Sequence, residues 1–216
     1  MKRILKKSIW HEMLWAVLLA FLAYGFVPAI ALAHDGKIWL DYSQAQRRQA
    51  LAGFVHCYRM DTSSNVAFVN VDVSAAVKNI DKIAVSMDSR IANIILQALK
   101  NAPAVKSDIH AEHWDGPDGF ATGMWWRGLD DQDRDAYVQG VFWCTETSVN
   151  IAVSVPKKSV RDAVKRLNDW YVVSDDDWKD PRSNARVDVP VVEAMQLDDI
   201  VIVQGSKESP FRRRGQ

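Results

Sequence analysis

The stretch WLDYSQAQRRQALAGFVHC, residues 39–57, recurs in altered form as WRGLDDQDRDAYVQGVFWC at residues 126–144. Four residues match at a constant spacing of 87, and the chain's two cysteines both belong to the match. Such internal repetition is typical of helical units that stack on one another. We therefore predict a mainly α-helical fold built from two tandem units related by a pseudo-twofold axis. The matched structural residues are Trp39, Arg47, Gly53 and Cys57 in the first copy and Trp126, Arg134, Gly140 and Cys144 in the second.

Each copy carries the signals of a helix start. Ser43 stands three residues before Gln46, which is the spacing of a capping box, and apolar residues then recur along one helix face. In the second copy Asp130 takes the cap position. The acidic residues that follow it suit the positive end of the helix dipole, so we favour a structural role for them over a metal site. These residues are Asp131, Asp133 and Asp135.

The paired Gly and Cys positions predict how the two helices meet. A glycine inside a helix costs about 1 kcal/mol relative to alanine, and here that cost occurs twice at the same place. Since Gly and Cys four residues apart share a helix face, we expect the helices to cross closely there and to be joined by a Cys57–Cys144 disulfide. An intermolecular bond and two buried thiols are the alternatives.

Further elements are expected in each half. A second helix carries Ala76, Ile80, Ile83 and Met87 in the first half and, at a spacing of 84, Val160, Val164, Leu167 and Tyr171 in the second. A third helix follows with Asp88 as its cap, and the second half adds one from Pro190 to about Val203. Valine-rich segments at 66–73 and 149–155 are interpreted as strands that pair with each other or as extended connectors.

The first 33 residues have the features of a signal peptide. Basic residues precede an apolar run, and Ala31-Leu32-Ala33 supplies a small-x-small cleavage site. We expect cleavage after Ala33 and a periplasmic protein that retains no membrane span; an uncleaved anchor is the alternative. The predicted organisation is a signal peptide at 1–33, helical unit 1 at 34–107, a linker loop at 108–125, helical unit 2 at 126–206 and a disordered basic tail at 207–216.

The charge balance excludes one class of partner. Removal of the predicted signal peptide leaves 23 basic and 26 acidic residues, a net charge of about −3. Nucleic-acid binding normally needs a basic surface, so we expect no nucleic-acid partner. The oligomeric state is not readable from the sequence.

Three histidines form a candidate metal site. His34 would be the mature N-terminus, where a free amine and its own imidazole suit copper. His110 and His113 in the linker are candidate additional ligands, and His56 adjoins Cys57. We prefer a solvated loop for the linker histidines and a structural role for His56, and we predict no cofactor.

The linker region also holds candidate contact residues. Trp114 and Trp125 are candidates for contact with a ligand or partner, whereas Trp126 belongs to the repeat and is expected in the core. The sequence has no nucleophile elbow, phosphate-binding loop or zinc-protease motif. We therefore expect a protein that is not an enzyme, with a cell-wall hydrolase using the linker acids as an alternative.

Segments Arg47–Cys57 and Asp133–Cys144, above all Arg134–Val141, resemble the first helix of small exported helical proteins. That group includes the periplasmic immunity proteins that protect bacteria from type VI secreted amidases. The stretch from Leu167–Tyr171 through Pro190–Ala194 resembles uncharacterised exported proteins with the same kind of unit. The resemblance covers about a third of the mature chain. It implies a helical fold and a protein partner.

Together these features predict a soluble, non-enzymatic binding protein of the bacterial envelope whose partner is another protein, and the resemblance suggests an immunity-like role. A periplasmic copper-binding protein using His34, His110 and His113 is the second hypothesis. A hydrolase acting on the cell wall is the third.

Overall fold

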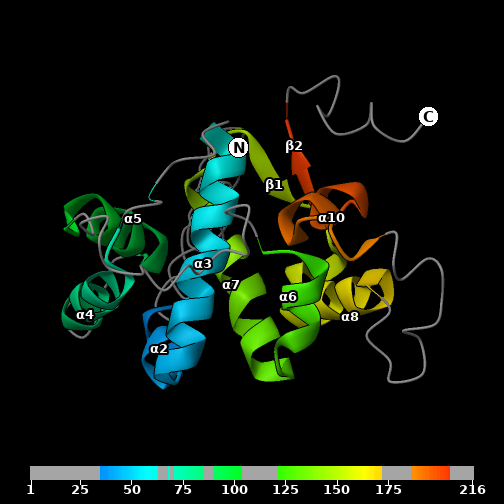
Figure 1. Ribbon diagram of the computed structural model, residues 1–216. Helices are drawn as coiled ribbons and strands as arrows, with labels where there is room; N and C mark the ends of the chain where they lie inside the picture. The colour runs from blue at the N-terminus through cyan, green and yellow to red at the C-terminus, as the bar shows by residue number, and fades with distance from the viewer. Residues whose placement is uncertain are drawn as a thin grey trace, which may run out of the picture.

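The computed structural model describes residues 35–62, 68, 71–84, 90–103, 121–171 and 186–204. Within these ranges the chain is mainly helical, with one small antiparallel sheet, as the sequence predicts. Figure 1 shows α3 and α7 side by side at the centre, with α4 and α5 on one side and α8 and α10 on the other. The helices of the first half are α2 (Asp35–Asp41), α3 (Gln44–Thr62), α4 (Val73–Ala84) and α5 (Ile91–Asn101).

The second half also begins with a short helix and a long one, and it contains two strands, one of which lies between α7 and α8. Its elements are α6 (Gly123–Gly128), α7 (Asp131–Thr147), β1 (Ile151–Val153), the 3₁₀ helix η1 (Pro156–Lys158), α8 (Val160–Tyr171), α10 (Val191–Leu197) and β2 (Val201–Val203). Gly123–Trp125, which the sequence assigned to the linker, therefore belong to α6.

Both predicted helix starts are confirmed. The Gln46 backbone N–H donates to Ser43 Oγ at 3.2 Å while the Ser43 N–H donates to Gln46 Oε1 at 2.8 Å, which completes the capping box. The Asp133 backbone N–H donates to Asp130 Oδ1 at 2.8 Å. These caps fix where α3 and α7 begin, and hence where their interiors face each other.

The α3–α7 contact is the largest between any two described elements. A Cβ built on Gly53 would lie 2.0 Å from the backbone oxygen of Tyr137, and one built on Gly140 would lie 1.8 Å from that of Ala50. Each glycine therefore lets the other helix's backbone approach. Since Tyr137 lies 87 residues after Ala50, the two contacts are reciprocal. The predicted close crossing is confirmed.

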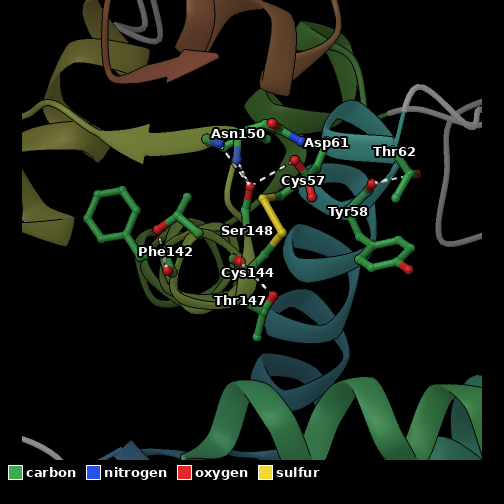
Figure 2. The surroundings of a disulfide bond; sticks show 11 residues. Cys57, Tyr58, Asp61, Thr62, Phe142, Cys144, Thr147, Ser148 and Asn150 are labelled. Atoms are coloured by element: carbon green, nitrogen blue, oxygen red, sulfur yellow. Dashed lines mark hydrogen bonds between the residues drawn. A yellow bond between two sulfur atoms is a disulfide. The ribbon is translucent and has the colours of Figure 1, made fainter. Parts of the chain in front are cut away.

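The disulfide joins the same two helices, as predicted. Cys57 and Cys144 are bonded with their Cα atoms 6.1 Å apart, and both side chains are buried. Figure 2 shows the bond bridging α3 and α7, with Ser148 Oγ donating to Asp61 Oδ1 at 2.8 Å close by. The sulfurs and this hydrogen bond pin the helix ends that lie beyond the glycines.

Three predictions about the outer elements were wrong. The second helices correspond at a spacing of 87, because α4 spans Val73–Ala84 and α8 spans Val160–Tyr171, not at 84. The third helix begins at Ile91 with Arg90 in the N-cap position, where the sequence proposed Asp88. The last helix ends at Leu197, not near Val203.

The predicted strand at 149–155 is present as β1, but its partner differs from the expected one. β1 pairs antiparallel with β2, in the register Ile151↔Val203, Ala152↔Ile202 and Val153↔Val201. The apolar residues Val201–Val203 also suit the end of a helix, but α10 ends at Leu197 and Asp199, at a φ of 53°, has left the helical conformation before β2 begins. Most of the 66–73 segment, the predicted signal peptide and the basic tail lie outside the described residues.

We predict that Gly53→Ala or Gly140→Ala lowers stability although alanine is the better helix former. The new Cβ meets a backbone oxygen that only a parting of the helices can move, so the loss should be about 3 kcal/mol or more. Gly128→Ala is the matched control, since nothing lies within 4 Å of its Cβ position. Urea unfolding of the oxidised proteins measures the differences; equal stability of all three variants would contradict the close crossing.

We also predict that the disulfide contributes about 4 kcal/mol, because it closes a loop of 87 residues in the unfolded chain. The measurement is urea unfolding of the wild type and of the Cys57→Ala/Cys144→Ala double variant, which leaves no unpaired thiol. Alkylation of the folded wild type without reductant should label no cysteine. A labelled cysteine, or an unchanged urea midpoint, would refute the assignment.

Candidate functional site

The first tryptophan–arginine pair fastens α2 and α4 to α3. The Arg47 guanidinium donates from Nε to the backbone oxygen of Trp39 at 3.1 Å and from Nη2 to that of Leu40 at 2.8 Å. Its Nη1 lies 3.1 Å from Asp81 Oδ2, and the Trp39 indole N–H donates to Asp81 Oδ1 at 2.8 Å. One carboxylate on α4 thus satisfies both the arginine and the buried tryptophan.

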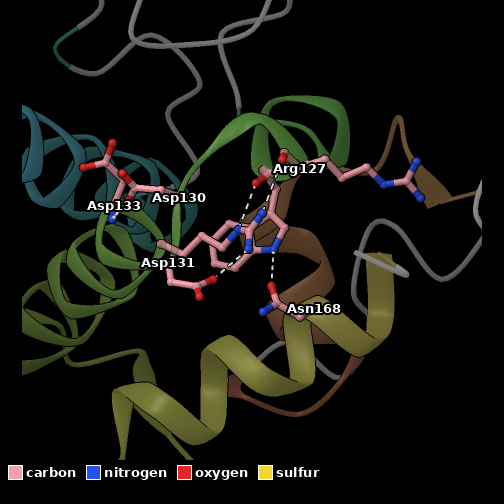
Figure 3. Close-up of polar contacts among 7 residues, drawn as sticks. Arg127, Asp130, Asp131, Asp133 and Asn168 are labelled. Carbon is pink, nitrogen blue, oxygen red and sulfur yellow. Dashed lines mark hydrogen bonds and ion pairs between the residues drawn. The ribbon is translucent and has the colours of Figure 1, made fainter. Parts of the chain in front are cut away.

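The second pair makes similar contacts, except that a neutral amide accepts the indole hydrogen bond in place of a carboxylate. The Arg134 guanidinium donates to the backbone oxygens of Trp126 and Arg127, each at 3.2 Å. The Trp126 indole N–H donates at 2.9 Å to Asn168, a neutral amide at the position that follows Asp81 by 87 residues. Asp131 supplies the missing carboxylate, 3.0 Å from Arg134 Nη1. Figure 3 shows Asn168 and Asp131 on opposite sides of this cluster.

The six residues that the sequence assigned to the repeat framework are therefore structural. Trp39, Trp126 and Arg134 are buried, and each arginine donates to the backbone oxygens of a tryptophan and of the residue after it. The acidic start of α7 is structural in the same way, because Asp130 caps the helix and Asp131 pairs with Arg134. Burial first, and then a neighbouring Asp carboxylate, raises the pKa of both Asp133 and Asp135.

Buried polar groups lie along the α3–α7 contact. His56 Nδ1 is 2.9 Å from the Tyr137 hydroxyl, and both side chains are buried. Because Cys57 is bonded to Cys144, it offers no thiolate beside His56. Tyr42 packs against the Trp143 ring, and burial together with the Asp135 carboxylate raises the pKa of Tyr42 to about 12. His56 and Tyr137 are thus enclosed in the core, and Tyr42 is a partly buried residue that packs against it.

An open pocket of about 350 Å³ lies on the outer side of α8. Its floor is one face of that helix, because Arg166, Asp169 and Trp170 stand at positions i, i+3 and i+4. Arg186 and Asp198 complete the lining from two other segments. We call this set, Arg166, Asp169, Trp170, Arg186 and Asp198, the α8 pocket.

Backbone contacts position Arg186 at the pocket. The Met124 N–H donates to the Val187 oxygen at 3.1 Å, and the Tyr171 hydroxyl donates to the Val189 oxygen at 2.9 Å. These bonds tie the segment after residue 185 to α6 and to the end of α8. The Arg186 guanidinium then lies over the Trp170 indole, 4.3 Å from its centroid, and donates to the Trp170 backbone oxygen at 3.2 Å.

The other arginine of the pocket is paired internally. Arg166 Nε lies 2.7 Å from Asp198 Oδ2, and its Nη2 also donates to the Asp198 backbone oxygen. Asp198 is the C-cap of α10, so this ion pair holds α10 to α8. The pocket therefore has a fixed wall and floor, with aromatic, cationic and anionic groups facing one space.

The remaining site predictions have different outcomes. Trp125 is partly buried, with its ring centroid 5.1 Å from that of Tyr137, and so packs on the core. Trp114, His34, His110 and His113 lie outside the described residues. Within the described ranges, no three His, Cys, Asp or Glu side chains gather in a group that could hold a metal ion.

Sequence reasoning missed the α8 pocket because its residues come from three separate segments and form no motif. The available signal was the spacing of Arg166, Asp169 and Trp170, which places two charges and an aromatic ring on one face of an amphipathic helix. Arg186 and Asp198 give no such signal, since only the folded chain brings them there.

Comparisons of the chain with protein-family models, with curated proteins and with solved structures gave no match. No helix among the described ranges has the length and apolar character that crossing a bilayer requires. The α8 pocket and the exposed side chains beside it are therefore interpreted from their own chemistry.

We predict that Asn168→Leu destabilises the protein by about 1–3 kcal/mol, because it leaves the buried Trp126 indole N–H without an acceptor. Asn168→Asp retains an acceptor oxygen, which is the arrangement that Trp39 already has with Asp81. Thermal unfolding of both variants is the measurement. If Asn168→Leu is as stable as Asn168→Asp, the indole hydrogen bond does not anchor α8.

Proposed function

We propose that this chain is an exported, non-enzymatic binding protein of the bacterial envelope that engages a protein partner through the α8 pocket. The main support for this proposal is that Trp170, Arg166 and Arg186 line one open pocket. Tryptophan and arginine dominate the binding energy of protein interfaces, because they bring large contact area and several hydrogen bonds to one place.

Two exposed apolar side chains belong to segments that are joined to pocket residues, and they support the proposal. Met124, 65 % exposed, is hydrogen-bonded through its backbone to the residue after Arg186. Leu197, 39 % exposed, directly precedes Asp198. Protein–protein interfaces are enriched in aromatic residues, methionine and arginine, and this part of the surface has the same composition.

The non-enzymatic part of the proposal is supported by where the reactive groups lie. The two cysteines are consumed in a buried disulfide, and His56 is buried against Tyr137. Export is supported by the signal-like segment 1–33 and by the disulfide, which persists in oxidising compartments. The resemblance to immunity proteins gives the proposal a narrower form, in which the partner is a secreted cell-wall amidase.

We further propose that the two halves arose by tandem duplication and pack about a pseudo-twofold axis. The support is reciprocity: Gly53 meets Tyr137 while Gly140 meets Ala50. The bonded pairs Cys57–Cys144 and Asp61–Ser148 each join residues 87 apart. A residue on a twofold axis contacts its own equivalent. The α8 pocket belongs to the second half alone, so this origin does not by itself supply a second site.

We predict that Trp170→Ala abolishes partner capture. Tagged mature protein, His34–Gln216, is used to retain proteins from an envelope extract. Loss of an interface tryptophan typically weakens binding by about thirtyfold or more. Lys165→Ala is the matched control, an exposed position on the same helix that does not line the pocket. Trp170→Phe preserves apolar packing and controls for folding.

Capture of the same proteins by Trp170→Ala and wild type would contradict a partner site at this pocket. A wild type that retains nothing specific from the envelope would contradict the protein-binding function itself.

A further inference from the structure

The charges of the α8 pocket fall into two groups, paired and open. Arg166 and Asp198 neutralise each other across 2.7 Å. Arg186 stacks on Trp170 and donates to a backbone oxygen, and Asp169 is exposed. Among the described residues, neither Arg186 nor Asp169 lies within ion-pair distance of an opposite charge. The pocket thus keeps one cation and one anion for an incoming group.

Arg186 is arranged as an anion receptor. Its guanidinium carbon lies 4.3 Å from the indole centroid and its Nη1 donates to the Trp170 oxygen, so less side-chain entropy remains to be lost when a ligand binds. One of its five N–H donors is used on the Trp170 oxygen, which leaves an edge for a carboxylate. Arginine and a carboxylate form paired hydrogen bonds when that edge is open.

Asp169 supplies the complementary contact. It lies one residue before Trp170 on the exposed face of α8, in the same pocket. A ligand with only a carboxylate would meet Arg186 but would place a negative charge near Asp169. A ligand with only an ammonium group would bind Asp169 but would place a positive charge near Arg186. Both conflicts vanish for a ligand that carries the two charges side by side.

We infer that the α8 pocket recognises a partner segment in which an acidic and a basic side chain stand close together, with the acid on Arg186 and the base on Asp169. This inference rests on the proposed function and names the chemistry of the partner. A volume of about 350 Å³ admits two such side-chain ends, and it lies at the lower end of the roughly 300–1,000 Å³ typical of ligand pockets.

The same positions in the first half lack this chemistry. The residues 87 positions before Arg166, Asp169 and Trp170 are Asn79, Lys82 and Ile83. Ile83 and Trp170 are both partly buried and pack on the core, so the two places differ in the charges beside that residue and not in its packing. The pocket's charges are therefore an addition to the second half and not a requirement of the shared framework.

The test uses four blocked dipeptides and the intact mature protein. The probes are acetyl-Glu-Lys-amide, acetyl-Glu-Gln-amide, acetyl-Gln-Lys-amide and acetyl-Gln-Gln-amide, whose capped ends carry no terminal charge. Binding is followed by the indole N–H resonance of Trp170, assigned as the signal absent from Trp170→Phe. The Glu-Lys probe should bind best, and each replacement of a charge by Gln should weaken binding about two- to fivefold, the range of exposed charge pairs.

Two single-charge variants give the decisive result. Arg186→Gln should lose the preference for Glu over Gln and keep the preference for Lys, whereas Asp169→Asn should do the opposite. Both preferences should shrink as sodium chloride is raised, because the pairs are exposed to screening. The inference would be overturned if Arg186→Gln kept the preference for Glu and Asp169→Asn kept the preference for Lys. It would also be overturned if no probe shifted the Trp170 signal.

Two further outcomes separate this inference from neighbouring ideas. Envelope capture that depends on Trp170 but is unchanged in Arg186→Gln and Asp169→Asn would preserve the proposed function and overturn the charge-pair recognition. Tighter binding of unblocked alanine, a small zwitterion, than of the Glu-Lys probe would overturn the partner segment and assign the pocket to free amino acids.

Discussion

The backbone-to-backbone approach of α3 and α7 is the constraint on which the rest of the structure depends. No side chain separates the helices at Gly53 and Gly140, so each glycine rests against a carbonyl oxygen of the other helix. At this separation the larger side chains along both helices lie on either side of the crossing, where Phe54 of α3 and Trp143 of α7 are buried in the core. The disulfide then fixes the crossing one turn further along, so the helices cannot slide without breaking it.

Once that crossing is set, the tryptophan–arginine pairs determine where the outer helices attach. Each arginine donates to the backbone oxygens of a tryptophan and of the residue after it, and each indole N–H donates to a polar side chain on α4 or α8. Polar bonds of this kind have fixed directions, unlike apolar contacts. They therefore place α4 and α8 at defined positions beside the central pair, and through α8 they set the floor of the pocket.

Much of this framework could be predicted from the sequence because it is local or repeated. Ser43 and Asp130 cap their helices through hydrogen bonds to the residue three positions later in the sequence. The glycine and cysteine positions both recur at a spacing of 87 residues. The pairing of β1 with β2 could not be predicted, because Val201–Val203 is apolar in a way that suits a helix end or a strand. The spacing of 84 failed because apolar periodicity alone tolerates a slip of one helical turn, whereas the Trp39–Asp81 bond does not.

The candidate site was less predictable than the fold for a related reason. The residues that match at a spacing of 87 are used for packing. The α8 residues stand where the sequence differs at this spacing: Trp170 follows Ile83, Asp169 follows Lys82, and Asn168 follows Asp81 by 87 positions. The neutral Asn168 does not leave Arg134 without a carboxylate, because Asp131 forms the ion pair with Arg134 instead. Among the described residues Asp169 pairs with no opposite charge, and Trp170 meets Arg186 from another segment, so these two differences come together at the α8 pocket, which we propose as the partner site.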